Sequence, residues 1–207
     1  DPNCILFSVW TAGLEGWLPV HRLDTNTTGA MLLAHTPEDA RMLIGQFARR
    51  TVSKEYICLV HGLLDTEGVV DAPIVPSDGI QKSRVDTVNG RDSLTRYSCM
   101  CTYRLKVSLS ADRMMEAASL MRVQIMTGRT HQIRCHLAHI GHPLCGDVKY
   151  GGKRSCCMTS FPQMFLHSSR LGFCSGSEWI TIADPLPPRF AQTLEVLSQR
   201  AVARRQA

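Results

Sequence analysis

The first residue of this chain that could do chemistry is Asp24, in the stretch "HRLDTNTTG". It is the one carboxylate there; the basic pair His21-Arg22 precedes it, and a polar run ending at Gly29 follows it. That run has the residue types of a tight turn. A carboxylate in this position is compatible with four roles, namely turn former, helix cap, metal ligand or nucleophile. From these nine residues alone, a turn former is the simplest interpretation.

A second chemical feature is the histidine-rich stretch "TGRTHQIRCHLAHIGHP", which invites a zinc interpretation. The pattern is not H-E-x-x-H, no carboxylate lies within the cluster, and Gly141 and Pro143 break the helix around the last histidine. We therefore expect no metal site and interpret these side chains as solvated or at the edge of the core. The histidines concerned are His131, His136, His139 and His142.

Arg129, in the same stretch, lies in a glycine-containing turn between a predicted strand and a predicted helix. Side chains at such junctions are held outward by rigid elements, where functional groups are often placed. A helix N-terminus nearby also favours an anion, which a phosphate or a carboxylate would satisfy. A surface arginine on a turn is the simpler local interpretation.

The charge of the chain is unevenly distributed. The net charge is +5, but residues 1–112 hold 11 Lys/Arg and 13 Asp/Glu, whereas residues 113–207 hold 12 and 5. Such an offset is compatible with a polyanionic partner and equally with a basic soluble surface. No apolar run approaches the roughly 20 residues that cross a bilayer, so we expect no membrane partner.

The nine cysteines form no C-x-x-C pairs, and their number is odd. A secreted disulfide framework is therefore not expected. Free thiols in a reducing intracellular compartment, cytoplasm or mitochondrion, are the simpler account.

The elements that must position these residues mix strands and helices without regular alternation. In the helix predicted over 36–50, Thr36 can cap the start, Pro37 suits the first turn, and apolar residues recur along one face from Ala40 to Ala48. This mixture predicts an α+β fold with a mixed or largely antiparallel sheet. The other expected elements are strands over 30–35, 52–62, 119–126, 164–173 and 177–183, a long excursion over 64–95, a turn at 127–130, a helix over 131–141 and a final helix from about 190 to 201.

Four stretches together resemble the RluA-type pseudouridine synthases: "HRLDTNTTG", "SKEY", "TGRTHQIRCHLAHIGHPLCGDVKYGG" and "FLHSSRLGF". Their order and spacing from about Leu18 to about Phe190 make the resemblance specific, which a lone H-R-L-D would not. It implies the family's α+β catalytic fold, with a mixed, mostly antiparallel sheet, flanking helices and a central cleft, in a single domain over 1–207. It also implies conversion of a uridine in structured rRNA or tRNA to pseudouridine, without a cofactor.

The resemblance assigns catalytic roles to three residues. Asp24 matches the family's catalytic carboxylate, acting as nucleophile or base, and Arg129 matches the arginine that pairs with it and keeps it ionised. Tyr56 matches the tyrosine that stacks on the target base. Without the family match, Tyr56 would be interpreted as a core strand residue.

Further residues are expected to bind RNA. Arg22 matches the residue that helps displace the target nucleotide from its stack, a step needed because the glycosidic bond is otherwise inaccessible. Ile133 falls at the apolar position of the pocket, and Gln132 and Arg134 are expected to contact backbone or buttress Arg129. Judged from their immediate neighbours alone, Lys54 would instead form a solvated ion pair, and Ile133 would instead lie on the core side of its helix. The complete expected RNA-binding set is His21, Arg22, Thr28, Lys54, His131, Gln132, Ile133 and Arg134.

Departures from the family pattern keep other functions open. The stretch "CILFSVWTAGLEGW" lacks the family's N-terminal Lys-Pro-x-Gly strand, and we expect no N-terminal RNA-binding module. One alternative is therefore a catalytically inactive RNA-binding or ribosome-assembly factor on the same fold, and another is a zinc hydrolase using the histidines. The expected partners are RNA and ribosomal assembly particles, with the chain acting as a monomer.

Overall fold

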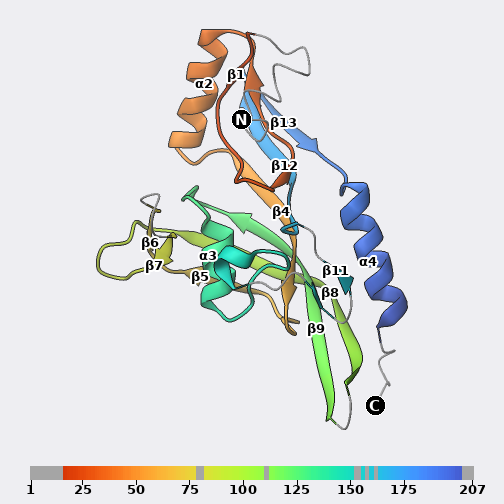
Figure 1. Ribbon diagram of the computed structural model, residues 1–207. Helices are drawn as coiled ribbons and strands as arrows, with labels where there is room; N and C mark the ends of the chain where they lie inside the picture. The colour runs from red at the N-terminus through yellow and green to blue at the C-terminus, as the bar shows by residue number, and fades with distance from the viewer. Residues whose placement is uncertain are drawn as a thin grey trace.

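One curved β-sheet organises the molecule (Figure 1). The computed structural model describes residues 16–77, 82–109, 112–151, 155–156, 159–160 and 163–201. The sheet has seven strands in the order β13-β12-β4-β9-β8-β5, with β2 also paired to β12. All of these pairings are antiparallel except that of β2 with β12, which is parallel. The strands are β2 (Thr28–Gly29), β4 (Ser53–His61), β5 (Gly68–Asp71), β8 (Leu94–Leu109), β9 (Asp112–Ile125), β12 (Leu166–Ser175) and β13 (Glu178–Ala183).

Three α-helices, one short 3-10 helix and several short strands complete the described part of the chain. The α+β class with a mostly antiparallel sheet is confirmed. None of the helices in the described ranges is long and apolar enough to span a membrane. The helices are α2 (Pro37–Ala48), α3 (Gln132–His139), the short 3-10 helix η1 (Val148–Tyr150) and α4 (Pro188–Arg200). The short strands are β1 (Leu18–Pro19), β3 (Leu33–Ala34), β6 (Ile74–Val75), β7 (Arg84–Val85), β10 (Ser155–Cys156) and β11 (Thr159–Ser160).

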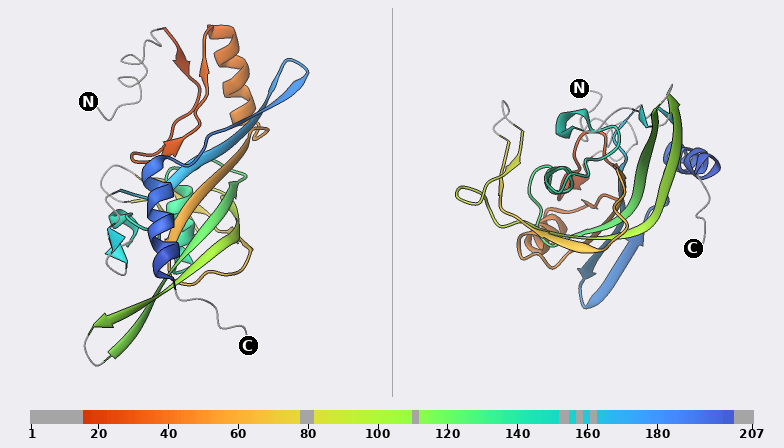
Figure 2. Two further views of the ribbon diagram at one scale, coloured as in Figure 1. Left: turned by 90° about the vertical axis from the view of Figure 1, so that its right-hand side faces the viewer. Right: turned by 90° about the horizontal axis from the view of Figure 1, so that it is seen from below.

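The two faces of the sheet carry two separate cores, because side chains alternate along a strand. Cys58 and Val60 in β4 face one core, where Leu137 of α3 packs, and Leu59 faces the other, where Leu197 of α4 packs. All five of these side chains are fully buried. In the right-hand view of Figure 2, α3 lies inside the curve of the sheet and α4 outside it. Burying a large apolar side chain contributes about 1.5–3 kcal/mol to the stability of the fold, so the two cores stabilise the sheet from both of its faces.

A third core holds α2 against the N-terminal segment. The Thr36 hydroxyl accepts a hydrogen bond from the Asp39 amide at 3.1 Å, which confirms Thr36 as the helix cap. Ala40 and Leu43 then pack with Leu171 of β12 in one buried cluster. The segment leading to Asp24 is therefore fixed to the end of the sheet through α2.

Several expected elements differ from the structure in extent. The strand expected over 30–35 is only Leu33–Ala34, and the strand expected over 119–126 is the end of the much longer β9. β8 pairs with β9 along most of its length and was not predicted. The expected excursion over 64–95 does contain short strands, namely β5, β6 and β7.

Gly29 is the point where β2 touches β12, and an alanine there is expected to destabilise the fold. Its φ is +112°, and an added Cβ would lie 2.3 Å from the backbone oxygen of Ser168. Because neither backbone can move without breaking the pairing, Gly29→Ala should lower the free energy of unfolding by more than about 2 kcal/mol in urea denaturation. Gly176 is the control, with φ +60° and no heavy atom within 4 Å of an added Cβ. Equal losses for the two alanine variants would contradict the prediction, since Gly176→Ala should cost only about 1 kcal/mol of backbone strain.

Candidate active site

A cleft of about 410 Å³ opens between the N-terminal segment, the junction of α2 with β4, and the loop that enters α3. Its size is within the usual range for small-molecule sites, about 300–1,000 Å³. It brings together residues predicted from three separate stretches of sequence. The predicted site residues that line it are His21, Arg22, Asp24, Lys54, Tyr56, Arg129, His131, Gln132 and Ile133.

Asp24 is presented to the cleft by a tight turn. Its carbonyl accepts a hydrogen bond from the Thr27 amide at 2.9 Å, and Asn26 has the positive φ of 68° that asparagine tolerates in turns. The Asp24 carboxylate takes no part in this turn bond, and its side chain is 20% exposed. Asp24 is thus a turn former through its backbone, while its carboxylate faces the cleft.

The turn is anchored to the sheet just beyond Asp24. The Ala30 amide donates to the Ser168 carbonyl at 2.8 Å, and the Thr28 hydroxyl lies 3.0 Å from Nδ1 of His167. His167 is fully buried. Thr28 therefore fixes the position of the turn from inside the protein.

The cation paired with Asp24 is Arg134 of α3. Nη1 of Arg134 lies 3.6 Å from Oδ2 of Asp24. The other nitrogens of the guanidinium bind Asp147 in a two-point pair, Nε to Oδ2 at 2.7 Å and Nη2 to Oδ1 at 2.9 Å. The guanidinium carbon also lies 5.0 Å from the centre of the Tyr150 ring. Such a fork-to-carboxylate pair fixes the plane of the guanidinium, so its remaining nitrogen is held toward Asp24.

The predicted pairing of Asp24 with Arg129 is thereby corrected. Nε of Arg129 donates instead to the backbone oxygen of Asp92 at 3.1 Å. Arg129 lies on the turn that precedes α3, close to the start of β8, whereas Arg134 lies within α3 and pairs with both Asp147 and Asp24. Arg129 still lines the cleft. Its catalytic role stays a prediction.

Tyr56 belongs both to the core and to the cleft. It is 8% exposed and packs in the same cluster as Ile133, yet both residues line the cleft. Burial, and next the nearby charge of Asp24, raise the pKa of the Tyr56 hydroxyl to about 12. The phenol is therefore neutral over the physiological range, and what it offers to the cleft is an uncharged aromatic surface.

Lys54 and Arg22 bring positive charge to the cleft in different ways. Lys54 is 8% exposed, its Nζ donates to the Thr127 carbonyl at 3.2 Å, and burial, followed by the charge of Arg50, lowers its pKa. It is therefore not in the solvated ion pair that was its local alternative. Arg22 is exposed, and its guanidinium makes no hydrogen bond or ion pair with the residues that the structure describes.

His21 supports the site and should make stability depend on pH. Its Nε2 accepts from the Leu32 amide at 2.8 Å, and its ring stacks on Phe47 at 4.6 Å. Burial, and to a smaller extent the charge of Lys54, lower its pKa from 6.5 to about 4. The unfolded chain therefore binds more protons between these two values, so the stabilisation is complete above pH 6.5 and is lost as the pH falls toward 4.

His21→Gln tests this dependence, because glutamine keeps an acceptor for the Leu32 amide but does not titrate. Over the pH range from 6.5 down to 4, the unchanged protein should lose up to about 3 kcal/mol more unfolding free energy than the variant. Urea denaturation at a series of pH values measures the difference. Parallel pH profiles for the two proteins would contradict the assignment.

Gln132 acts as the buttress of the loop that enters α3. Its Oε1 accepts from the Thr127 hydroxyl and the Arg129 amide at 2.7 and 3.0 Å. Its Nε2 donates to the Leu94 carbonyl and the Thr95 hydroxyl at 2.9 and 3.0 Å. The expected contact with Arg129 is therefore found, and the amide is fully used within the protein.

Three of the four histidines of the same stretch have protein partners rather than a shared centre. His131 Nδ1 bonds the Tyr150 hydroxyl at 3.0 Å, His136 bonds Thr95 and the Ala72 carbonyl, and His142 bonds the His61 carbonyl. Within the described ranges, no three His, Cys, Asp or Glu residues are grouped so that they could hold a metal ion.

Several residues of the site were not predicted. Asp147 and Tyr150 belong to the stretch "GDVKY" that carried the resemblance, but no role was assigned to them. Phe47 and Arg50, at the end of α2, line the cleft without lying in any of the quoted stretches. The sequence feature that could have indicated Phe47 and Arg50 as site residues was their position just before the strand that begins with "SKEY".

Comparisons with known proteins identify the family. Residues 11–139 match the family model described as RNA pseudouridylate synthase. Ribosomal large subunit pseudouridine synthase D of Pseudomonas aeruginosa is 34% identical over 193 residues, covering 87% of this chain and 56% of that protein. Ribosomal large subunit pseudouridine synthase C of Vibrio parahaemolyticus is 33% identical over 181 residues, covering 84% and 53%. The chain thus spans about half the length of the curated relatives that it matches.

Solved structures agree on the fold. Human RNA pseudouridylate synthase domain containing 1 superposes with a TM-score of 0.72 at 24% identity, covering 96% of this chain and 86% of that one. Human RNA pseudouridylate synthase domain containing 4 gives a TM-score of 0.70 at 25% identity, covering 93% and 81%. With the family model matching more than half of its residues, the chain belongs to the RNA pseudouridylate synthase family.

Proposed function

We propose that the chain is an RNA pseudouridine synthase, with Asp24 as its catalytic carboxylate. The observation that carries this is the arrangement of Asp24 in the cleft, with Arg134 3.6 Å from one of its oxygens and the Tyr56 ring lining the same space. A carboxylate, its cation and an aromatic surface are the groups needed to act on the sugar and to support the base. All three are held by rigid elements: an anchored turn, the helix α3 and the strand β4.

The reaction is an isomerisation, so each bond and proton that is lost is replaced. The bond between N1 of uracil and C1′ of ribose breaks, the uracil turns, C5 bonds to C1′, and the proton that leaves C5 is replaced by one taken up at N1. Asp24 either attacks C1′, in which case its bond to C1′ breaks as C5 bonds there, or removes a ribose proton that it later returns; both roles need an ionised carboxylate close to the nucleotide. A neutral Tyr56 supports the turning base without fixing it by charge, because every base presents a face on which to stack.

RNA must present the target uridine outside its stack to reach Asp24, since a duplex cannot enter a cleft of about 410 Å³. Arg22, exposed beside Asp24, is the proposed residue that takes the place of the flipped nucleotide. The excess of cations in residues 113–207 would bind the phosphate backbone, so affinity should fall steeply with salt.

The proposed substrate is ribosomal RNA. Two relatives in different bacteria carry the name ribosomal large subunit pseudouridine synthase, which supports rRNA over tRNA. We further propose that residues 1–207 form one catalytic domain and that this domain acts as a monomer. The six cysteines whose side chains are described are free thiols, which supports a reducing compartment, cytoplasm or mitochondrion.

The test is to incubate the protein separately with total rRNA and total tRNA and to map pseudouridine in each. New pseudouridine at a defined uridine of rRNA is the expected result. Binding of RNA without product on any cellular RNA would instead favour a catalytically inactive RNA-binding or ribosome-assembly factor, including association with assembly particles.

A further inference from the structure

The residue that follows the C-cap of α2, Arg50, is of an unusual type for the backbone conformation found there. The Thr51 amide donates to the Gln46 carbonyl at 3.0 Å, and the Arg50 amide donates to the Phe47 carbonyl at 3.1 Å. These two bonds define a Schellman motif, in which the residue after the cap adopts the left-handed conformation and is usually glycine. Here that residue is Arg50, with a φ of 60°. A side chain in this conformation destabilises the backbone, and such strain tends to persist where function requires the side chain.

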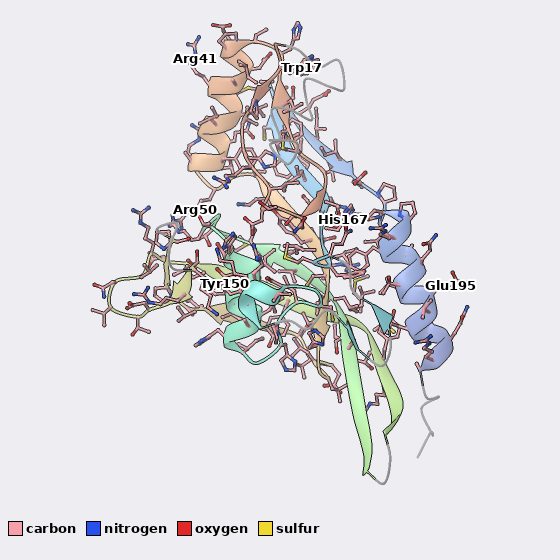
Figure 3. All side chains as sticks on the ribbon, viewed as in Figure 1. Trp17, Arg41, Arg50, Tyr150, His167 and Glu195 are labelled. Atoms are coloured by element: carbon pink, nitrogen blue, oxygen red, sulfur yellow. The ribbon has the colours of Figure 1, made fainter. Side chains whose placement is uncertain are left out.

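The Arg50 side chain contributes nothing visible to the fold. It is exposed, and it makes no hydrogen bond or ion pair with the part of the chain that the structure describes. It does line the cleft, and Figure 3 labels it at the lower end of α2. The strain at this turn is therefore not offset by a contact of the guanidinium within the described protein.

Arg50 lies in a region of unbalanced positive charge. Its charge acts on Lys54, whose amine is hydrogen-bonded, among the described residues, to a backbone carbonyl alone, and Arg22 lines the same cleft. Asp24 is the one carboxylate among the described lining residues, and Arg134 is already paired with it. A group of cations without a carboxylate partner is suited to an anion supplied from outside.

We infer that Arg50 is a phosphate-binding residue, held at the cleft by the left-handed turn so that its guanidinium, with Lys54 behind it, takes one phosphodiester of the RNA backbone. The inference rests on the proposed function, because it names the contact by which that cleft holds RNA next to the flipped nucleotide. A guanidinium can donate two parallel hydrogen bonds to a phosphate, which an amine cannot.

Arg50→Gly separates binding from folding, because the two should move in opposite directions. Glycine relieves the left-handed strain, so the Tm should stay at or above that of the unchanged protein. Loss of one phosphate contact should raise the Kd for RNA several-fold and reduce the slope of log Kd against log salt by about 0.7–0.9. Fluorescence anisotropy with a labelled, uridine-containing RNA hairpin at a series of KCl concentrations measures both binding quantities.

Arg49→Ala is the matched control. It removes the same charge one residue earlier, but the Arg49 guanidinium lies against Gly45 on its own helix and does not line the cleft. The Kd and salt slope of this variant should stay close to those of the unchanged protein. Equal effects of Arg49→Ala and Arg50→Gly on RNA binding would overturn the inference, since only net charge would then matter.

Two further outcomes also decide the matter. A Tm of Arg50→Gly several degrees below that of the unchanged protein would overturn the inference, because Arg50 would then support the fold. Absence of pseudouridine from all RNA treated with the unchanged protein would overturn the proposed function by itself, whereas an unaltered Kd for Arg50→Gly overturns only the phosphate contact.

Discussion

Asp24→Asn is expected to abolish pseudouridine formation while leaving RNA binding intact. The amide has the shape of the carboxylate, so the turn made by the Asp24 carbonyl and the Thr27 amide is kept. It can neither attack the sugar nor accept a proton, and the rate should fall by at least about 10³-fold. The variant also removes a negative charge from a cleft lined by several cations, so the Kd for RNA should be unchanged or lower.

Single-turnover assays with saturating enzyme isolate this effect from binding. Asp65→Asn is the control, because Asp65 is exposed in a segment away from the cleft and its loss should change neither rate nor Kd. If Asp24→Asn kept more than about a tenth of the rate, Asp24 would not be the catalytic group.

Asp147→Ala is expected to produce the largest loss of stability of any single substitution considered. Asp147 is 2% exposed and is bonded through both oxygens to Arg134, which is 7% exposed. Removing one partner of a buried ion pair leaves the other charge uncompensated, which costs about 3–5 kcal/mol. The guanidinium would also lose the contact that directs Nη1 to Asp24, so pseudouridine formation should fall with stability.

Urea denaturation gives the loss of unfolding free energy, and Glu38→Ala is the matched control. Glu38 pairs with Arg41 on the surface of α2, where both side chains are 73% exposed. A solvated pair of this kind contributes less than about 1 kcal/mol. A similar loss for Asp147→Ala and Glu38→Ala would show that the Arg134–Asp147 pair is not a structural centre of the site.

The parts of the fold that were predicted from sequence are those fixed by local signals. α2 begins where Thr36 caps it and ends where the apolar face ends. β4 follows the alternation around Cys58, and α3 carries Ile133 and Leu137 into the core as its periodicity indicated.

The long β8–β9 hairpin could not be predicted in the same way. Its pairing continues from Thr95 opposite Ile125 to Leu109 opposite Asp112 and includes a register shift between Cys99 and Cys101. Such a bulge interrupts the alternation on which strand prediction rests, and pairing with a partner strand is not visible in either segment alone.

The candidate site shows the same limit at the level of single residues. The order of the motifs was enough to expect Asp24 and Tyr56 in one place, and the cleft brings them together. It was not enough to choose between Arg129 and Arg134, which are five residues apart in one motif. That choice depends on Asp147, whose carboxylate comes from a different loop and orients only one of the two arginines.

The parallel pairing of β2 with β12 has a consequence for how the cleft is assembled during synthesis of the chain. Thr28 and Gly29 lie opposite His167 and Ser168, so the turn that presents Asp24 is anchored by residues translated about 140 positions later. Because chains emerge from the ribosome with the N-terminal part first, Asp24 emerges long before His167 and Ser168 have been synthesised. The nascent chain therefore carries the proposed catalytic carboxylate on an unfixed segment, and the cleft is complete only when β12 has emerged and closed this long loop.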